Sequence, residues 1–406
     1  MSPFLQLALI IALILIAAKI AGYISMRLGQ PSVLGEILIG IILGPSLLDV
    51  THLGFVTDTH LDEIAIELGE IGVLILMFLA GLELHLKDLA KNTRVSAFAG
   101  SLGVLFPVVL GWLVGYLMGF HPNQALFLGL TLGATSVSIS AQTLMELNAL
   151  RSRVGLGLLG AAVFDDVLVI LLLSSFLAVF DGSGGSSSVL LVVVRMSIFL
   201  VLSVLFGLYG LPRLSRLVRK LPISQGSLTL AIVVLLLYGI AAELIGEMAA
   251  ITGSFIAGLM FARTTEKTII ENGMRSIAYS LFVPIFFISI GLTINIRSLD
   301  LSAFWLMLLI SAIAIISKIL GAGLGSRIAR FSWKESLQMG IGMVSRGEVG
   351  LIVAQVGVSQ GLITPEVFSA VIGMVVITTL VTPPLLRLVF QKNNPVEFIP
   401  KDVPAS

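Results

Sequence analysis

The sequence predicts an all-α membrane protein of thirteen transmembrane helices. They form two inverted six-helix repeats joined by a linker helix, with helices broken near the membrane midplane. Three observations predict this fold class: the composition, the number of long apolar segments, and short motifs that recur in both halves. Of the 406 residues, 57% are hydrophobic and 12% are charged, whereas soluble proteins carry about 25% charged residues. The mean hydropathy of +1.08 is likewise typical of membrane proteins.

Charge and cysteine content exclude several classes of function. The net charge of +1 gives no indication of a nucleic-acid partner. The chain has no cysteine, which excludes disulfides, thiol redox chemistry and thiolate metal sites. The N-terminus lacks a basic region and a small-residue cleavage site, so we interpret it as a first transmembrane helix and not as a signal peptide.

Apolar segments divide the chain. A spanning helix needs about 20 mostly apolar residues, and we expect thirteen such helices. They are predicted at residues 3–26, 32–48, 61–84, 95–118, 123–147, 152–180, 189–211, 227–247, 250–263, 278–296, 301–327, 335–359 and 364–390. Together they form an exchanger domain over residues 1–392, followed by a short cytoplasmic tail at 393–406.

The distribution of basic residues predicts the orientation. Alternate loops on one side, together with the tail, hold 19 of the 24 Lys and Arg residues, and the opposite loops hold one, Arg297. Basic loops stay on the cytoplasmic side of a membrane. We therefore expect a multi-pass protein of the inner (plasma) membrane with an external N-terminus and a cytoplasmic C-terminus, which agrees with an odd number of helices.

Three motifs in the first half of the chain recur in the second half, each at nearly the same separation along the sequence. FLAGLELHLKDL at residues 78–89 resembles ISIGLTINIRSL at 288–299. Gly35–Gly40 resembles Gly253–Gly258, and the dipeptide Ala-Gln recurs at 141–142 and 354–355. These matches predict one repeat over about 3–180, a linker helix at about 189–211 and a second repeat over about 227–390. Because a single helix lies between the two six-helix repeats, the second repeat has the opposite orientation in the membrane. This arrangement is typical of secondary transporters.

Two adjacent carboxylates, Asp165 and Asp166, lie deep in the sixth apolar segment. Ionisable groups inside a membrane are costly and are usually functional. Adjacent helical residues point about 100° apart, so one carboxylate can meet a fixed cation while the other faces a cavity. Burial favours the protonated form of a carboxylate, whereas a nearby cation favours its charged form. A carboxylate on which these two effects balance can exchange a proton for Na⁺. The alternative is a purely structural role, in which one aspartate forms an ion pair and the other lies at the rim of a cavity.

Lys318 lies midway along the eleventh segment with no acidic neighbour in sequence. Its partner must therefore come from another helix, and we expect Asp165. Because a buried lysine deprotonates readily once it loses its partner, Lys318 is a candidate proton carrier. A permanent Asp165–Lys318 strut is the alternative.

Residues 133–140 and 343–350 are rich in Gly, Ser and Thr and occupy equivalent positions in the two repeats. Paired weak helical segments of this kind indicate broken helices at a transport site. Thr135 and Ser136 offer hydroxyl oxygens for a hard cation, although Ser and Thr also serve ordinary helix packing. We expect Na⁺ to bind at Asp166, Asp165 and Thr135.

Arg346 and Glu348 lie in the second of these stretches. Two residues apart, they would diverge on a regular helix. We expect them to balance the electrostatics of the helix break rather than to bind the ion directly.

At these motifs the chain resembles the bacterial sodium/proton antiporters of the monovalent cation:proton antiporter-2 family, in their two-aspartate form. The resemblance covers almost the whole chain. It rests on QPSVLGE at residues 30–36, FLAGLE at 78–83, ATSV at 134–137, FDD at 164–166 and SRGEVGLI at 345–352.

The resemblance implies a core domain that moves like an elevator against a dimerisation domain. The fifth and twelfth helices would be broken and would cross near the membrane midplane beside the ion site, and helices 1 and 8 would form a homodimer contact. Asp166 would bind the ion, and Asp165 would pair with Lys318. The Asp-Asp-Lys combination implies electrogenic exchange of two protons per sodium ion.

The expected function is secondary active exchange of Na⁺ or Li⁺ for H⁺, with no covalent reaction and no cofactor besides the transported ions. A K⁺/H⁺ antiporter or K⁺ efflux transporter on the same fold is the nearest alternative. An ion channel is more distant, because inverted repeats favour a transporter. An intramembrane aspartyl protease needs two facing carboxylates, which neighbours on one helix cannot provide.

Overall fold

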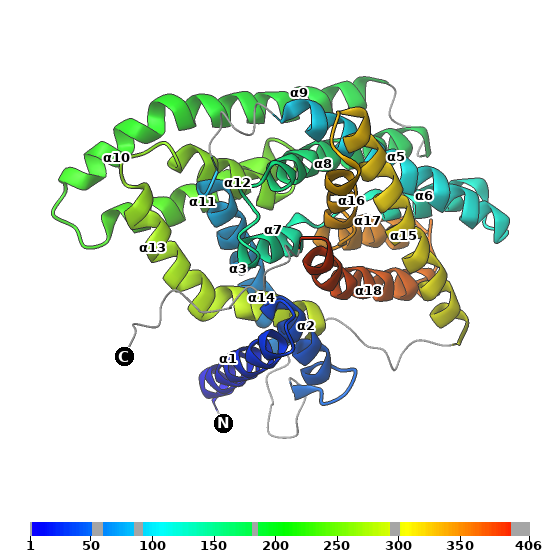
Figure 1. Ribbon diagram of the computed structural model, residues 1–406, viewed down its shortest axis with the longest axis horizontal. Helices are drawn as coiled ribbons and strands as arrows, with labels where there is room; N and C mark the ends of the chain where they lie inside the picture. Colours follow the sequence, from blue (N-terminus) through cyan, green and yellow to red (C-terminus); the bar gives the residue numbers. More distant parts are fainter. Residues whose placement is uncertain (1, 51–59, 85–91, 181–185, 293–300, 391–406) are drawn as a thin grey trace.

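The computed structural model of the protein describes residues 2–50, 60–84, 92–180, 186–292 and 301–390, and all regular secondary structure in these ranges is helical (Figure 1). Ten of the helices described there are long and apolar enough to cross a membrane, and three shorter apolar helices accompany them. The predicted class of all-helical multi-pass membrane protein is thus confirmed. The number of crossings stays a prediction, and the predicted tail lies outside the described residues.

The helices follow the predicted segments closely. The first half of the chain contains α1 (Pro3–Arg27), α2 (Ser32–Leu43), α3 (Leu61–Leu82), α5 (Thr93–Leu117), α6 (Pro122–Gly133), α7 (Val137–Glu146) and α8 (Arg153–Phe180). The second half contains α9 (Ser186–Leu205), the π-helical turn η2 (Phe206–Gly210), α10 (Leu211–Lys220), α11 (Gly226–Leu244), α12 (Ala250–Phe261), α13 (Lys267–Ile277), the π-helical turn η3 (Ala278–Phe282), α14 (Val283–Leu292), α15 (Leu301–Ile328), α16 (Trp333–Gly342), α17 (Glu348–Ser359) and α18 (Pro365–Phe390).

Three helix ends differ from the predicted segments. α2 stops at Leu43 and not at residue 48, because Pro45 disfavours the helical conformation of the residue before it. The helix of α9 and η2 continues through α10 to Lys220, past the predicted end at residue 211. Similarly, α13 precedes the predicted start at residue 278. Both extensions are amphipathic and carry basic residues in the last turn, so a search for purely apolar segments omits them.

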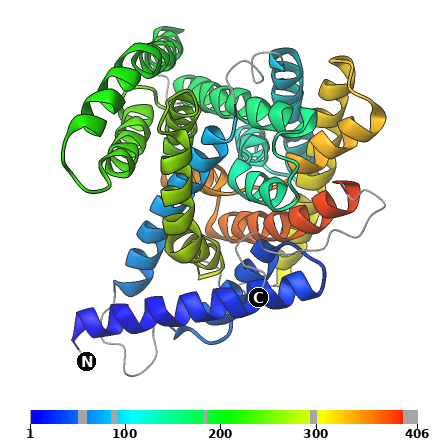
Figure 2. The same cartoon turned by 60° about the vertical axis from the view of Figure 1, so that its left-hand side comes forward.

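The helices pack in two groups. In one, α5 to α8 pack with α15 to α18; we call this group the core bundle. In the other, α1 to α3 pack with α11 to α14; with α9 and α10 we call this group the frame. Figure 1 shows α5, α6 and α15 to α18 of the core bundle on the right and α10, α11 and α13 of the frame on the left. In Figure 2, α1 runs along the lower edge of the molecule.

The crossing of α3 and α12 in the frame depends on two glycines. A Cβ atom on Gly81 would overlap the carbonyl oxygen of Phe255, and one on Gly258 would overlap the carbonyl oxygen of Phe78. The backbones of the two helices are therefore in direct contact, which only glycine allows. This crossing fixes α12 in the frame, and α12 in turn contributes to the site described below.

A second crossing, between α2 and α14, has the same construction. A Cβ atom on Gly40 would lie 2.5 Å from the carbonyl oxygen of Ile288, and one on Gly291 would overlap the backbone of Gly40. Close backbone approach through small residues is the usual means of helix association in a membrane, where burial of apolar surface gives little driving force. The frame is thus held together by tight crossings.

Candidate functional site

Two helices of the core bundle are interrupted where the sequence predicts weak helical segments. α6 ends at Gly133 and α7 begins at Val137, while α16 ends at Gly342 and α17 begins at Glu348. Ser and Thr in the gaps can bond neighbouring backbone groups in non-helical conformations, which weakens a helix locally. The interruptions leave backbone donors and acceptors unpaired inside the protein, and these need new partners.

Each break supplies the partners of the other. The backbone N–H of Ser136 donates to the carbonyl oxygen of Ser345 at 2.8 Å. The hydroxyl of Ser345 donates in return to the carbonyl oxygen of Ser136 at 2.5 Å. The hydroxyl of Ser140 donates to the carbonyl oxygen of Gly342 at 2.6 Å. The two breaks therefore lie side by side, and the hydrogen bonds between them stabilise both non-helical segments inside the core bundle.

Arg346 lies in the second break and is fully buried. Its Nη1 atom donates to the carbonyl oxygen of Ala134 at 2.6 Å, and Nη2 donates to that of Ala314 at 3.3 Å. Ala134 is the C-cap of α6, where the helix dipole places partial negative charge. This geometry fits the predicted electrostatic role of Arg346. Glu348 begins α17, and its side chain lies outside the described part of the structure.

Replacing Arg346 with Gln is expected to destabilise the protein by about 3 kcal/mol, because charged hydrogen bonds to two buried carbonyl groups are lost. Arg346→Lys keeps the charge but not the two-pronged geometry, so an intermediate loss is expected. Thermal unfolding of the purified protein in detergent measures both. Arg327→Gln is the matched control, since Arg327 also donates to a backbone carbonyl oxygen, that of Phe331, but from an exposed position. Equal stability of all variants would contradict this assignment.

Asp165 of α8 and Lys318 of α15 form a fully buried ion pair. The Nζ atom of Lys318 lies 2.6 Å from Oδ1 of Asp165, and both side chains are 0% exposed. In the described part of the structure, Oδ2 of Asp165 has no hydrogen-bond partner. The pairing expected from the sequence is therefore present, and it joins α8 to α15 inside the core bundle.

Asp166 points to a different neighbour, as the helical geometry requires. Its side chain is buried, and Oδ2 accepts a hydrogen bond of 2.8 Å from the hydroxyl of Thr252 in α12. Asp166 and Thr252 also line a cavity of about 20 Å³ whose other walls are apolar. A cavity of about 10–15 Å³ or more can hold one water molecule. Asp166 thus faces a space of single-ion size at the boundary between core bundle and frame.

The two predicted hydroxyl ligands differ in availability. Thr135 is buried, and among the described residues its hydroxyl has no hydrogen-bond partner. Ser136 is engaged, because its hydroxyl lies 3.0 Å from that of Ser138. Ser136 and Arg346 also line a second cavity of about 260 Å³ that includes Glu70 and Ser289 of the frame. The helix breaks are therefore reached by a cavity between the two helix groups.

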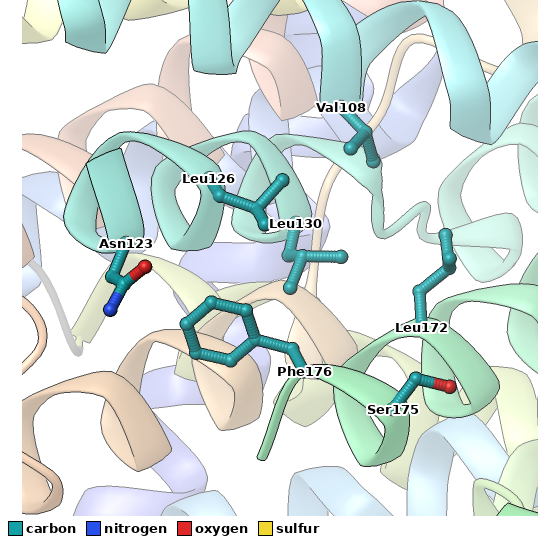
Figure 3. A pocket seen from close by; sticks show the side chains of 7 residues that line it. All are labelled: Val108, Asn123, Leu126, Leu130, Leu172, Ser175 and Phe176. Atoms are coloured by element: carbon teal, nitrogen blue, oxygen red, sulfur yellow. The ribbon is translucent and has the colours of Figure 1, made fainter. Parts of the chain in front are cut away.

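A larger cavity of about 450 Å³ lies elsewhere in the core bundle, between α5, α6 and α8. Figure 3 shows that apolar side chains dominate its wall, with Asn123 and Ser175 as the polar residues. It includes none of the predicted site residues. Its lining suits an apolar molecule more than a cation, so we do not place the ion site there.

Two polar groups at the boundary do not follow from the sequence. Thr252 is one of them, and a single Thr at a helix start carries no sequence signal that distinguishes it from a packing residue. The other is Glu146 at the end of α7, whose carboxylate accepts hydrogen bonds from the N–H and hydroxyl of Ser32 in α2 at 2.9 and 2.5 Å. Its position at a segment end resembles that of a loop residue, and only the packing of α2 against α7 reveals this half-buried contact.

The chemistry at Asp166 suits a hard monovalent ion. Within the described ranges no group of three or more His, Asp or Glu residues could hold a metal ion. The oxygens that the structure brings together at Asp166 are its own carboxylate and the hydroxyl of Thr252, and oxygen is the ligand atom that hard cations prefer. Thr135 and Asp165 do not line the cavity that Asp166 faces.

Comparisons with known proteins agree with this chemistry. The profile of the family described as "Sodium/hydrogen exchanger, transmembrane" matches residues 11–392. The Na⁺/H⁺-K⁺ antiporter GerN of Bacillus cereus is 40% identical over 380 residues, which covers 94% of this chain and 95% of the relative. A Na⁺/H⁺ antiporter of Enterococcus hirae is 35% identical over 384 residues, with 94% and 98% covered.

A solved structure supports the fold. The sodium proton antiporter MjNhaP1 of Methanocaldococcus jannaschii aligns with a TM-score of 0.65 over 94% of this chain and 96% of its own, at 18% identity. Members of the matched family are transporters, so their cations are substrates and not resident cofactors. The chain belongs to the sodium/hydrogen exchanger family, and the resemblance to antiporters that its motifs predict is confirmed.

Proposed function

We propose that this protein exchanges Na⁺ or Li⁺ for H⁺ across the plasma membrane, with cation and proton competing for Asp166 and Asp165. The observation that carries the proposal is the buried Asp165–Lys318 pair next to Asp166, which faces a cavity of about 20 Å³. A bare carboxylate in a dry site is costly. Either a proton or a cation removes this cost, so binding of one displaces the other.

Each residue of the site has a distinct proposed role. Asp166 binds the transported ion, with Asp165 and the free hydroxyl of Thr135 as further ligands. Lys318 balances Asp165 and acts as the second proton carrier. This makes the exchange electrogenic, with two protons per sodium ion. Arg346 and Glu348 stabilise the helix breaks.

The inverted-repeat layout is part of the proposal: repeat one at about 3–180, a linker at about 189–211 and repeat two at about 227–390. Equivalent contacts support it. Gly81 contacts the helix of Gly258, and the corresponding pair, Gly291 and Gly40, forms the crossing of α14 and α2. Ser136 and Ser345 likewise bond each other reciprocally. Thirteen crossings follow from this layout, and the distribution of basic residues favours an external N-terminus and a cytoplasmic C-terminus.

We infer that the core bundle moves against the frame and carries the ion to either face. The breaks and the Asp165–Lys318 pair lie within the core bundle, so they can travel as a unit. A homodimer through α1 and α11, the first and eighth predicted helices, would anchor the frame. Apolar side chains such as Ile16 and Ile20 of α1 and Leu237 and Ile240 of α11 are exposed, as a contact with lipid or a second copy requires.

One gradient-collapse assay tests the function. In proteoliposomes with an imposed pH gradient, Na⁺ and Li⁺ are expected to dissipate the gradient saturably, and K⁺ to do so weakly. A response to K⁺ alone would replace this proposal with K⁺/H⁺ exchange, an alternative supported by the name of the GerN relative. Unsaturable, ohmic ion currents would instead indicate a channel.

A further inference from the structure

The hydrogen bond between Thr252 and Asp166 joins the two helix groups. Asp166 belongs to α8 in the core bundle, whereas Thr252 belongs to α12 in the frame. Both side chains are buried, and their oxygens lie 2.8 Å apart. The contact is therefore one that a relative movement of the two groups must break.

Thr252 is held firmly on the frame. It lies in the first turn of α12, and its backbone N–H donates to the carbonyl oxygen of Ala249. Further along α12, the close crossing at Gly258 fixes the helix against α3. The N-terminal end of a helix carries partial positive charge and favours a nearby anion. The hydroxyl of Thr252 is thus presented to Asp166 by a rigid element whose polarity suits a carboxylate.

The geometry also fits a shared cation. Ca²⁺, a hard cation of a size similar to Na⁺, takes oxygen ligands at about 2.3–2.6 Å. Two oxygens 2.8 Å apart can both lie at that distance from one ion. The cavity of about 20 Å³ that Thr252 and Asp166 line is large enough for a single ion or water.

We propose that Thr252 is a ligand of the transported cation, supplied by the frame in one position of the core bundle. Its hydroxyl donates to Asp166 when the carboxylate is bare and turns its oxygen to the ion when Na⁺ is bound. Movement of the core bundle removes this ligand. The site then has one oxygen fewer, so its affinity for Na⁺ differs between the two faces of the membrane. This inference rests on the proposed exchange function.

Sided transport measurements test it. The protein is reconstituted in one orientation, and the KM for Na⁺ is measured with Na⁺ added to each face in turn. Thr252→Val keeps the shape of the side chain but removes the hydroxyl. A hydrogen bond to a charged group is lost, so KM is expected to rise about tenfold on one face only, with the maximal rate little changed. Thr252→Ala should give the same one-sided change.

Two controls separate this role from a structural one. Thr252→Ser retains the hydroxyl and is expected to restore the wild-type KM on both faces. Ser254→Ala alters a neighbouring hydroxyl on α12 that lies 3.5 Å from a carbonyl oxygen of the frame, and it should leave both KM values unchanged. Wild-type KM values for both Thr252→Val and Thr252→Ala would overturn the inference. So would an equal loss of maximal rate on both faces that Thr252→Ser does not rescue.

The same experiment distinguishes a failure of the proposed function from a failure of the role of Thr252. If the wild-type protein shows no cation-dependent proton movement, the proposed function fails and the inference fails with it. If the wild-type protein exchanges Na⁺ for H⁺ and the Thr252 variants behave identically to it, only the role of Thr252 is rejected.

Discussion

Replacing Asp166 with Asn is expected to abolish Na⁺-dependent dissipation of a pH gradient, down to the level of liposomes without protein. Asn has nearly the same shape as Asp, so the hydroxyl of Thr252 keeps a hydrogen-bond acceptor, 2.8 Å away in the wild-type site. It has no charge, however, and can neither hold a proton in place of an ion nor balance the charge of a buried cation. We therefore expect both halves of the exchange to depend on this carboxylate.

The control for Asp166→Asn is a neutral substitution at a carboxylate away from the site. Glu271 pairs with Arg275 in the partly exposed α13, and Glu271→Gln is expected to leave exchange nearly unchanged. Gradient collapse by Na⁺ and Li⁺ is measured for both variants at equal reconstituted amounts. Near-normal exchange by Asp166→Asn would rule out Asp166 as the ion-binding group.

The parts of this site that follow from the sequence are those with a high cost of burial. Lys318 and Asp165 have no opposite charge nearby in sequence, and charges inside a membrane must be paired, so the amino-acid sequence alone predicts their contact. The helix breaks were predictable for a related reason, because Gly, Ser and Thr in two corresponding segments weaken both helices. The all-helical, multi-pass class follows from the composition and the long apolar segments, whereas the repeat layout rests on the recurring motifs.

Other parts depend on how helices pack, which local sequence does not encode. Thr252 contacts Asp166 only because the Gly81–Gly258 crossing sets α12 at one depth against α3. Glu146 is half-buried and bonded to Ser32 only because α2 begins beside the end of α7. The reciprocal bonds between Ser136 and Ser345 require a register between segments that lie far apart in the chain. No periodicity or composition contains that register.

Removing the charge of Lys318 from its pair with Asp165 is expected to cause a large loss of stability. Lys318→Gln leaves the carboxylate of Asp165 buried without its cation, and breaking a buried pair in this way costs about 3–5 kcal/mol. Both side chains are 0% exposed, so solvent cannot compensate for the lost partner. The single variant is expected to unfold at markedly lower temperature. The double variant Asp165→Asn/Lys318→Gln removes both charges and should recover most of the loss.

The transport behaviour of the same variants separates a proton carrier from a strut. If Lys318 carries the second proton, wild-type exchange moves one net charge per cycle and accelerates under a membrane potential of the appropriate sign. The double variant, which we expect to be stable enough to assay, should then exchange one proton per sodium ion and lose its response to an imposed potassium-diffusion potential. An unchanged voltage response in the double variant would show that Lys318 only holds α15 against α8. Charge movement in the wild type would then have to arise from another group.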